Sequence, residues 1–493
     1  MLKRTLLLLL LLPPFMTWAQ SDEPLRIELE SAKDQNDYQF ANMQEEGVLV
    51  FYPTDSPNPD SLSWVFVHYD TNFQKNYHFT IVFPLYTEYI SCSKSDNYLY
   101  LFFQKRFPKK ESVRNFLVTI QLSDHHYNIR EIRELQNREV YEIFSIDDEI
   151  VIHAGDNKKD SIYFYHNDLD KLYSLGDIFP YRMEFCVPDT FNHRWLVGLT
   201  QAKSEDPSGV FLYEYNFLTK KARIQNFQDK TPNKGDHIYN SARAMVINAD
   251  TTLLLGTYNT LQDRYSSNLH SGVYSLLLLG WELDSAHFYN YANLKTKSTD
   301  DNKKASGNLN LQVLVGRTAS GNNQYALATE VFYPEYDYSY RGYDPYYGYG
   351  YFGDAGTTTF IGYQHVNAYI TTFDQNGVLL WDNYLQFNNL VTKQLYPIVH
   401  LSFLENGETL IYYPRNNRIL SMLVSGYDIL EKISAINIES KSSRDMVEYN
   451  VDTEIEPWYG NYFLVSGYQY IRNRDKAIKA KRYVFHLNKL EYR

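Results

Sequence analysis

Short apolar runs separated by polar turns repeat along almost the whole chain. The runs are four to eight residues long, rich in Val, Ile, Leu, Tyr and Phe, and bounded by Asp, Asn and Gly. Branched and aromatic side chains suit a pleated strand, while Asp, Asn and Gly accept the backbone geometry of tight turns. Almost no segment shows the spacing of an amphipathic helix. The pattern therefore predicts an all-β protein.

Two kinds of hairpin alternate along the chain. In the first kind, an apolar strand and a polar turn precede a strongly apolar strand, in copies at 38–52, 89–103, 141–155, 183–199, 242–258, 311–330, 399–413 and 454–468. In the second kind, an Asp or Asn lies near the turn between two strands, in copies at 64–83, 116–132, 162–175, 211–227, 275–291, 368–385, 420–436 and 483–493.

Each pair of hairpins predicts one four-stranded antiparallel blade, so the chain is expected to form a β-propeller of eight blades, with seven as the alternative. Radial stacking buries both faces of a blade, which explains strands that are apolar almost throughout. The last copy is short, and the strand LRIELE at 25–30 is expected to complete its blade and close the ring.

One turn resembles a known repeat. The segment FDQNGVLLW, with Asp374, Gly377 and Trp381, resembles the outer hairpin of PQQ-type propeller repeats, in which a Gly turn precedes an apolar strand ending in Trp. The whole chain resembles exported bacterial propellers of the broad PQQ/WD40-like group. The resemblance implies a superfamily and not a particular enzyme.

The N-terminus reads as a secretory signal peptide covering residues 1–19. Lys3 and Arg4 precede an apolar run of seven residues, Leu6–Leu12, which is too short to cross a membrane, and Thr17 and Ala19 supply a cleavage site. Residues 20–493 are then one propeller domain with a Tyr/Gly-rich insertion at 333–355. We expect no transmembrane segment and an exported location: periplasmic, outer-membrane-associated or secreted.

The charge of the chain disfavours nucleic acid as a partner. The formal net charge is −12, and it moves to about −14 when Lys3 and Arg4 leave with the signal peptide, so phosphate backbones are repelled. The basic run Lys476, Lys479, Lys481 and Arg482 precedes a strand and reads as a solvated guard of a sheet edge.

The two cysteines, Cys92 and Cys186, fall at equivalent positions in the first strand of two units that are two blades apart. A disulfide needs Cα atoms within about 7 Å, and inner strands two blades apart should lie farther away than that. Although a disulfide is the default in an exported protein, we therefore expect two buried free thiols.

A search for catalytic motifs finds no G-x-S-x-G, no H-E-x-x-H, no P-loop, and no G-x-G-x-x-G that follows a strand. No catalytic residue, metal site or cofactor is therefore assigned. Propeller active sites, however, gather single residues from several blades around the central channel, where local spacing cannot reveal them. An enzyme of the lyase or glycosidase type thus stays open as an alternative.

The most unusual segment is YPEYDYSYRGYDPYYGYGYF, residues 333–352, in which nine of twenty residues are Tyr. So many rings do not suit a packed strand, and the segment is expected to be an insertion between the second and third strands of the sixth blade. It is either an excursion without a fixed structure or a contact surface, since Tyr recurs in binding loops. The candidate binding residues are Tyr336, Tyr338, Tyr340, Arg341, Tyr343, Tyr346, Tyr347, Tyr349 and Tyr351.

Together these features predict a non-catalytic exported propeller that serves as a protein-interaction scaffold in the bacterial cell envelope. The alternative is a propeller that binds or processes carbohydrate. The expected partner is accordingly an envelope protein or a glycan, and the oligomeric state stays open.

Overall fold

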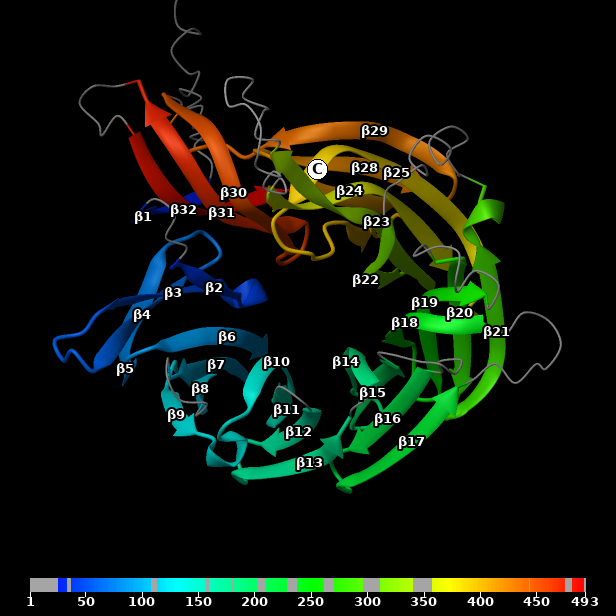
Figure 1. Cartoon of the computed structure of the whole chain (residues 1–493), viewed down its shortest axis with the longest axis horizontal. Coiled ribbons are helices and arrows are strands. Elements are labelled where there is room, and N and C mark those ends of the chain that lie inside the picture. Colours follow the sequence, from blue (N-terminus) through cyan, green and yellow to red (C-terminus); the bar gives the residue numbers. More distant parts are fainter. Residues whose placement is uncertain are drawn as a thin grey trace, which may run out of the picture.

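Eight four-stranded antiparallel sheets stand around a central opening (Figure 1). The chain is an eight-bladed β-propeller, so the prediction of eight blades is confirmed. The structure, a computed structural model, describes residues 25–32, 37–107, 113–156, 159–178, 181–201, 210–227, 237–260, 270–295, 311–339, 357–442, 444–474 and 481–491. The proposed signal peptide lies outside these residues.

The strands are numbered along the chain, and in blades 1 to 7 the first strand of each blade is the innermost. Blades 1 to 4 consist of β2 (Gln39–Asn42), β3 (Val48–Asp55), β4 (Ser61–Tyr69), β5 (Lys75–Pro84); β6 (Thr87–Lys94), β7 (Tyr98–Arg106), β8 (Val113–Gln121), β9 (Tyr127–Glu131); β10 (Glu139–Ile146), β11 (Glu149–Asp156), β12 (Lys159–His166), β13 (Lys171–Asp177); and β14 (Tyr181–Asp189), β15 (Arg194–Gln201), β16 (Val210–Asn216), β17 (Lys221–Phe227).

Blades 5 to 8 follow the same plan until the last strand. They consist of β18 (His237–Val246), β19 (Thr251–Thr260), β20 (Gly272–Leu279), β21 (Glu282–Asn290); β22 (Gln312–Gly321), β23 (Gln324–Ser339), β24 (Thr357–Phe373), β25 (Leu379–Thr392); β26 (His400–Phe403), β27 (Thr409–Arg415), β28 (Arg418–Ser425), β29 (Asp428–Asn437); and β30 (Asp445–Pro457), β31 (Tyr462–Asn473), β32 (Lys481–Glu491), β1 (Arg26–Ser31). Three short 3-10 helices lie at Gln44–Glu46, Arg133–Leu135 and Tyr291–Asn293. Within the described stretches, no helix is long and apolar enough to cross a membrane.

The predicted N-terminal strand closes the ring. β1 pairs antiparallel with β32, from Arg26 opposite Asn488 to Ser31 opposite Tyr483, and so supplies the outermost strand of blade 8. The expectation for residues 25–30 is therefore confirmed. Blade 8 is the one sheet that is made from both ends of the chain.

The core lies between neighbouring blades, because the strands present apolar side chains to both sides. Phe51 and Phe66 of blade 1, for example, pack with Phe103 of blade 2, with ring centroids 6.3 and 6.2 Å apart. In β7, six consecutive residues, 99–104, are buried. Radial stacking thus accounts for the continuous apolar runs in the sequence.

The alternation of antiparallel strands gives the disc two distinct faces. The turns between the first and second strands, and between the third and fourth, lie on one face. The turns between the second and third strands, and the connections from one blade to the next, lie on the other, which we call the connection face. The end of β23 and the start of β24, which flank residues 340–356, therefore lie at the connection face.

The turn of FDQNGVLLW joins β24 to β25 and is an outer hairpin, as its sequence suggests. The Asp374 carboxylate accepts hydrogen bonds from the backbone N–H groups of Asn376 (2.9 Å) and Val378 (2.8 Å). Gly377 has φ = 77°, and a Cβ there would lie 2.9 Å from Ser275 Oγ in blade 5. Glycine is thus required both by the backbone conformation and by the contact with the neighbouring blade.

Cys92 on β6 and Cys186 on β14 are both free thiols, as expected. Cys186 is buried and Cys92 is half-buried, and burial raises the pKa of each thiol above its usual value. Both thiols therefore stay protonated near neutral pH and act as small core side chains.

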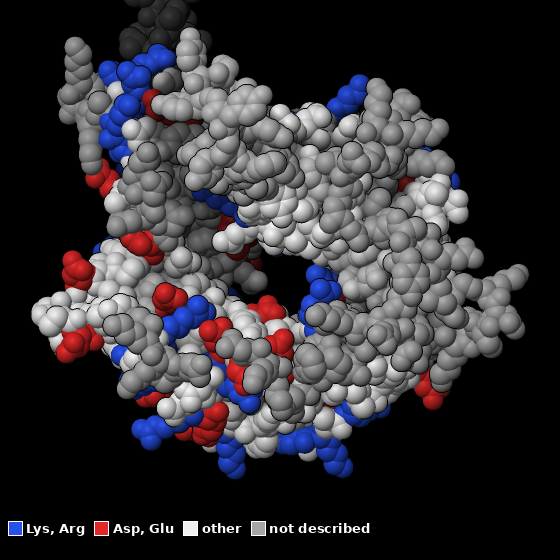
Figure 2. Space-filling view, in the orientation of Figure 1, with Lys and Arg blue, Asp and Glu red and all other residues white. Residues whose placement is uncertain are grey.

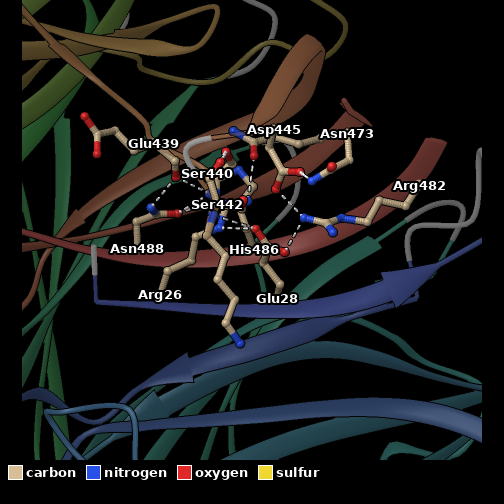
Figure 3. A network of polar contacts seen from close by, with 12 residues as sticks. Arg26, Glu28, Glu439, Ser440, Ser442, Asp445, Asn473, Arg482, His486 and Asn488 are labelled. Carbon is tan, nitrogen blue, oxygen red and sulfur yellow. Dashed lines mark hydrogen bonds and ion pairs between the residues drawn. The ribbon is translucent and has the colours of Figure 1, made fainter. Parts of the chain in front are cut away.

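A buried network of charged side chains holds the N-terminal strand to blade 8 (Figure 3). The guanidinium of Arg26 donates to the Glu28 carboxylate (2.7 Å), to the Asn488 side-chain oxygen (2.9 Å) and to the backbone carbonyl of Glu439 (2.7 Å). A further N–H of the same group donates to Gln469 Oε1 (2.6 Å). The Arg26 side chain is 0 % exposed. We call Arg26, Glu28, Asp445, Arg482 and Asn488 the closure network.

The closure network also corrects the interpretation of Arg482. Its guanidinium contacts Glu28 Oε2 at 3.0 Å and Asp445 Oδ2 at 2.5 Å, and the Arg482 side chain is 15 % exposed. Arg482 is therefore part of the clasp between β1, β30 and β32 and not a solvated edge residue. The sequence did not reveal this role of Arg482, because its acidic partners, Glu28 and Asp445, are far away in the chain.

Candidate functional site

Blade 6 departs from the other blades through one long hairpin. β23 has 16 residues and β24 has 17, against 7 to 10 in the corresponding strands of blades 1 to 5 and 7. Residues 333–339 belong to β23 and pair with 357–364 of β24. The expectation that no part of the Tyr-rich segment forms a strand was therefore wrong. Tyr333 packs against Leu311, Val331 and Tyr369, whereas Tyr336 contacts Phe360, so these two rings do not crowd each other.

An aromatic ladder runs along the face of this hairpin that looks toward blade 7. The ring centroids of Tyr336 and Phe360 are 5.5 Å apart, those of Phe360 and Tyr363 5.1 Å, and those of Tyr363 and Phe332 5.9 Å. Phe332 then lies 6.4 Å from the ring of His365. The ladder thus joins an exposed end of the hairpin to a buried imidazole.

The outer end of the ladder is an exposed apolar edge. Tyr336 and Phe360 are each 43 % exposed, and Ile361 and Val391 are also exposed. Val391 pairs with Gln364 and is next to Thr392, whose hydroxyl faces His365, so the Val391 side chain lies on the other side of the sheet. We call Tyr336, Phe360 and Ile361 the hairpin edge.

Of the candidate binding residues, the structure places Tyr336 in the hairpin edge and Tyr338 in strand β23. Tyr340, Arg341, Tyr343, Tyr346, Tyr347, Tyr349 and Tyr351 lie outside the described residues. The role of these residues therefore stays a prediction.

At its inner end the ladder meets a buried polar set, which we call the Glu330 network. Glu330 and His365 are 0 % exposed, and Glu330 Oε2 lies 3.1 Å from His365 Nδ1. The second oxygen, Glu330 Oε1, accepts hydrogen bonds of 2.9 Å from the backbone N–H groups of both Ile398 and Val399. A buried carboxylate thus holds the connection that leads from blade 6 to blade 7.

Thr392 completes the Glu330 network. His365 Nε2 lies 3.1 Å from Thr392 Oγ1, which is itself 2.7 Å from the backbone oxygen of Gln394. A carboxylate, an imidazole and a hydroxyl in series have the order of a nucleophile relay. The hydroxyl of Thr392, however, donates to the Gln394 carbonyl, so its proton is already engaged within the protein. The bonds are complete without a substrate, and the set is a structural staple.

A cleft of about 580 Å³ opens on the connection face, and Thr392 and Ile398, which are bonded to His365 and Glu330, line one of its walls. The end of β25 and the connection after it line this wall with Asn389, Leu390, Val391, Thr392, Lys393, Gln394, Tyr396 and Ile398. Blade 7 contributes Pro414 and Asn416, and the opposite wall consists of β30, β31 and the start of blade 1. The cleft therefore spans blades 6, 7, 8 and 1.

The opposite wall is tied to the closure network. Asn450, which lines the cleft, donates from Nδ2 to Asn417 Oδ1 (3.0 Å), and Gln469 Nε2 donates to the same oxygen (2.8 Å). Gln469 in turn accepts the bond from Arg26. A chain of hydrogen bonds thus runs from the ring closure to the cleft.

Aromatic side chains make the floor of the cleft on the side of blades 8 and 1. Tyr38 stacks on Phe485 with ring centroids 5.4 Å apart, and Tyr468 Oη receives a hydrogen bond from the backbone N–H of Tyr38 (3.0 Å). Burial raises the pKa of both tyrosines, which therefore keep their hydroxyl protons at neutral pH. The rings are held in place by these contacts.

The central opening has fewer features of a binding site than the cleft. Figure 2 shows it between the blades, with charged side chains gathered mainly over β6 to β17 and basic atoms at its edge. Burial raises the pKa of Glu456, whose carboxylate accepts a 3.1 Å hydrogen bond from Asn42. In the described part of the chain, no group of three or more His, Cys, Asp or Glu residues could hold a metal ion.

Sequence reasoning missed Glu330, His365, Thr392 and Arg26. Glu330 did carry a signal, because it follows the apolar run YALAT within a strand predicted to be buried on both sides. A charged residue at such a position must have partners. Which partners it has could not be seen, since they come from two other segments, β24 and the connection at residues 398 and 399.

Comparisons with known proteins find only distant structural likeness. No protein-family model matches the chain, and no curated protein matches it. Among solved structures, the β-propeller domain of the Trilobed protease from Pyrococcus furiosus is similar, with 7 % identity and a TM-score of 0.38, over 83 % of this chain and 96 % of that chain. The polysaccharide lyase Uly1 is similar at 9 % identity with a TM-score of 0.42, over 81 % of this chain and 89 % of that chain. The resemblance to the PQQ/WD40-like group stays a prediction.

Proposed function

We propose that this protein is a non-catalytic propeller that acts as an interaction scaffold in the cell envelope and binds a protein partner through the β23–β24 hairpin of blade 6. The observation that carries the proposal is the hairpin edge. Large apolar side chains exposed together on a folded surface mark contact sites, whereas single exposed ones are common. The hairpin edge consists of three such side chains at the base of the Tyr-rich segment.

Two further features support a contact role. The hairpin edge rests on the aromatic ladder, whose inner end is fixed by the Glu330 network, so the exposed rings stand on a rigid base. A rigid base reduces the conformational entropy that is lost on binding. Tyr also offers a large contact area with few rotatable bonds, which suits it to binding surfaces.

The test is site-specific photocrosslinking in cells that produce the protein. A photoreactive phenylalanine analogue replaces Phe360 in one variant and Phe191 in the control; Phe191 is 58 % exposed in the turn between β14 and β15, on the opposite face. We expect a crosslinked partner from position 360 and none from position 191. The purified partner should then bind the wild type at least tenfold more tightly than a Tyr336→Ser/Phe360→Ser variant. Equal labelling from both positions, or crosslinking only to a second copy of this chain, would contradict the proposal.

A further inference from the structure

The cleft on the connection face is lined by neutral polar groups. Five amide side chains line it: Gln39, Asn389, Gln394, Asn416 and Asn450. Each amide offers both donors and an acceptor, which is the pattern that a sugar hydroxyl needs, since a hydroxyl also donates and accepts. The volume of about 580 Å³ lies within the roughly 300–1,000 Å³ of small-molecule sites.

The lining carries little charge, although the chain as a whole is strongly acidic. Among the described residues that line the cleft, Lys393 and Glu454 are the charged ones, and their charges cancel. A charged ligand would lose its hydration without gaining a countercharge, which is costly. The cleft therefore suits an uncharged ligand.

Aromatic rings complete the lining. Tyr38, Phe40 and Tyr396 are half-buried at the cleft, and Tyr38 is held against Phe485. The C–H faces of a sugar ring pack well on such rings, while its hydroxyls reach the surrounding amides. This combination distinguishes a sugar site from a purely apolar pocket.

Both walls of the cleft are built before any ligand arrives. Glu330 and His365 hold the blade 6 wall from below, and the bonds from Arg26 through Gln469 and Asn417 hold Asn450 in the opposite wall. Fixed walls lower the ordering cost of binding. One buried acceptor in this lining, Asn450 Oδ1, has no hydrogen-bond partner, and a buried orphan of this kind is satisfied by a donor such as a hydroxyl or a water.

We propose that this cleft binds a neutral oligosaccharide, with the amides bonding its hydroxyls and the aromatic floor packing on its rings. The site is separate from the protein contact at positions 336 and 360, and either proposal can fail without the other. The proposal is one of binding, and no bond of the sugar is broken.

The test is isothermal titration of the folded protein with named hexasaccharides. The neutral set consists of cellohexaose, maltohexaose, xylohexaose, laminarihexaose, mannohexaose and chitohexaose, and the charged set is hexagalacturonate and hexaguluronate. We expect at least one neutral hexasaccharide to bind with a Kd below about 1 mM, and binding of the charged set to be at least tenfold weaker.

Matched variants assign the binding to the cleft. Gln39→Ala/Gln394→Ala removes two amides from the lining, and Gln74→Ala removes one exposed amide from the connection between β4 and β5. Binding should weaken at least tenfold in the first variant and stay within twofold in the second, with unchanged melting temperatures. No binding by any neutral member, equal binding by the two variants, or preference for a charged member would overturn the proposal.

Discussion

Blades 6 and 8 use the same chemical device for different purposes. Each contains a charged side chain that is completely buried, Arg26 in blade 8 and Glu330 in blade 6. Arg26 bonds to side chains and one carbonyl around a strand that comes from the other end of the chain. Glu330 bonds to the backbone of the connection that leaves its own blade.

The difference shows what each buried ion stabilises. Blade 8 cannot rely on chain connectivity between β1 and β32, so the closure network supplies specific attachment in addition to the strand pairing. Blade 6 is continuous, and its sheet needs no such lock. The Glu330 network instead fixes an irregular segment on the surface, which shapes the cleft. Arg26 therefore stabilises the closure of the ring, and Glu330 stabilises a surface segment.

Removal of Arg26 should produce the largest effect. The Arg26→Met variant leaves the Glu28 carboxylate and the Gln469 amide buried with fewer partners, and breaking a buried ion pair in this way costs about 3–5 kcal/mol. We expect a fall of that size in the free energy of unfolding, measured by urea titration. The control is Arg114→Ala, whose pair with Glu131 is partly exposed and should contribute below about 1 kcal/mol. Equal losses in the two variants would show that the clasp does not hold the ring.

A change at Glu330 should be smaller and more local. Glu330→Gln keeps the shape but cannot accept bonds at both positions, so the loss should be about 1–3 kcal/mol. Hydrogen exchange should rise at the amides of Ile398 and Val399, which donate to Glu330. The exposed Glu431→Gln in blade 7 is the matched control. Unchanged hydrogen exchange at the amides of 398 and 399 would show that the Glu330 network does not hold the cleft wall.

Blade 8 should also respond to acid. His486 is 0 % exposed beside Arg26, its Nδ1 lies 2.8 Å from Asn488 Oδ1, and burial lowers the pKa of its imidazole well below the usual value. The unfolded chain binds a proton near pH 6.5 and the folded chain does not. Stability is thus fully present above pH 6.5 and falls below it, by at most about 1.4 kcal/mol per pH unit for this group.

The pH prediction is checked by melting temperatures between pH 7.5 and 5.5. His486→Gln should reduce the slope of the wild type, although His68, His270 and His400, whose pKa values are also lowered, keep part of it. The exposed His78→Gln is the matched control for the loss of one histidine. If the melting temperature depends on pH in the same way in all three proteins, His486 does not contribute to the loss of stability in acid.

The hairpin edge should have the smallest effect on stability. In the Tyr336→Ser/Phe360→Ser variant, both side chains are already 43 % exposed, so the free energy of unfolding should change by about 0.5 kcal/mol or less per site. Thermal unfolding of this variant and the wild type measures the difference. A loss above about 2 kcal/mol would mean that the edge is part of the core and not a free contact surface.

Much of the fold followed from local patterns. Hairpin spacing predicts the blades and their number. The short last hairpin predicts that the strand at 25–30 completes the final blade. The repeat also placed Cys92 and Cys186 two blades apart, which led to the free thiols. These features depend on the order of apolar and polar residues within short segments, which the sequence displays directly.

The candidate site needed the tertiary structure. Glu330, His365, Thr392 and Ile398 come together from three strands and a connection, and Arg26 meets Gln469 across 443 residues of chain. The Tyr-rich segment looked unsuited to a strand, yet pairing with β24 extends β23 through Ser339.

The amino-acid sequence by itself thus determined the blades, because burial between stacked sheets acts on every strand in the same way. Only the tertiary structure decided which buried charges find partners and where a cleft opens, because hydrogen bonds depend on the distance and direction between groups that are remote in the chain.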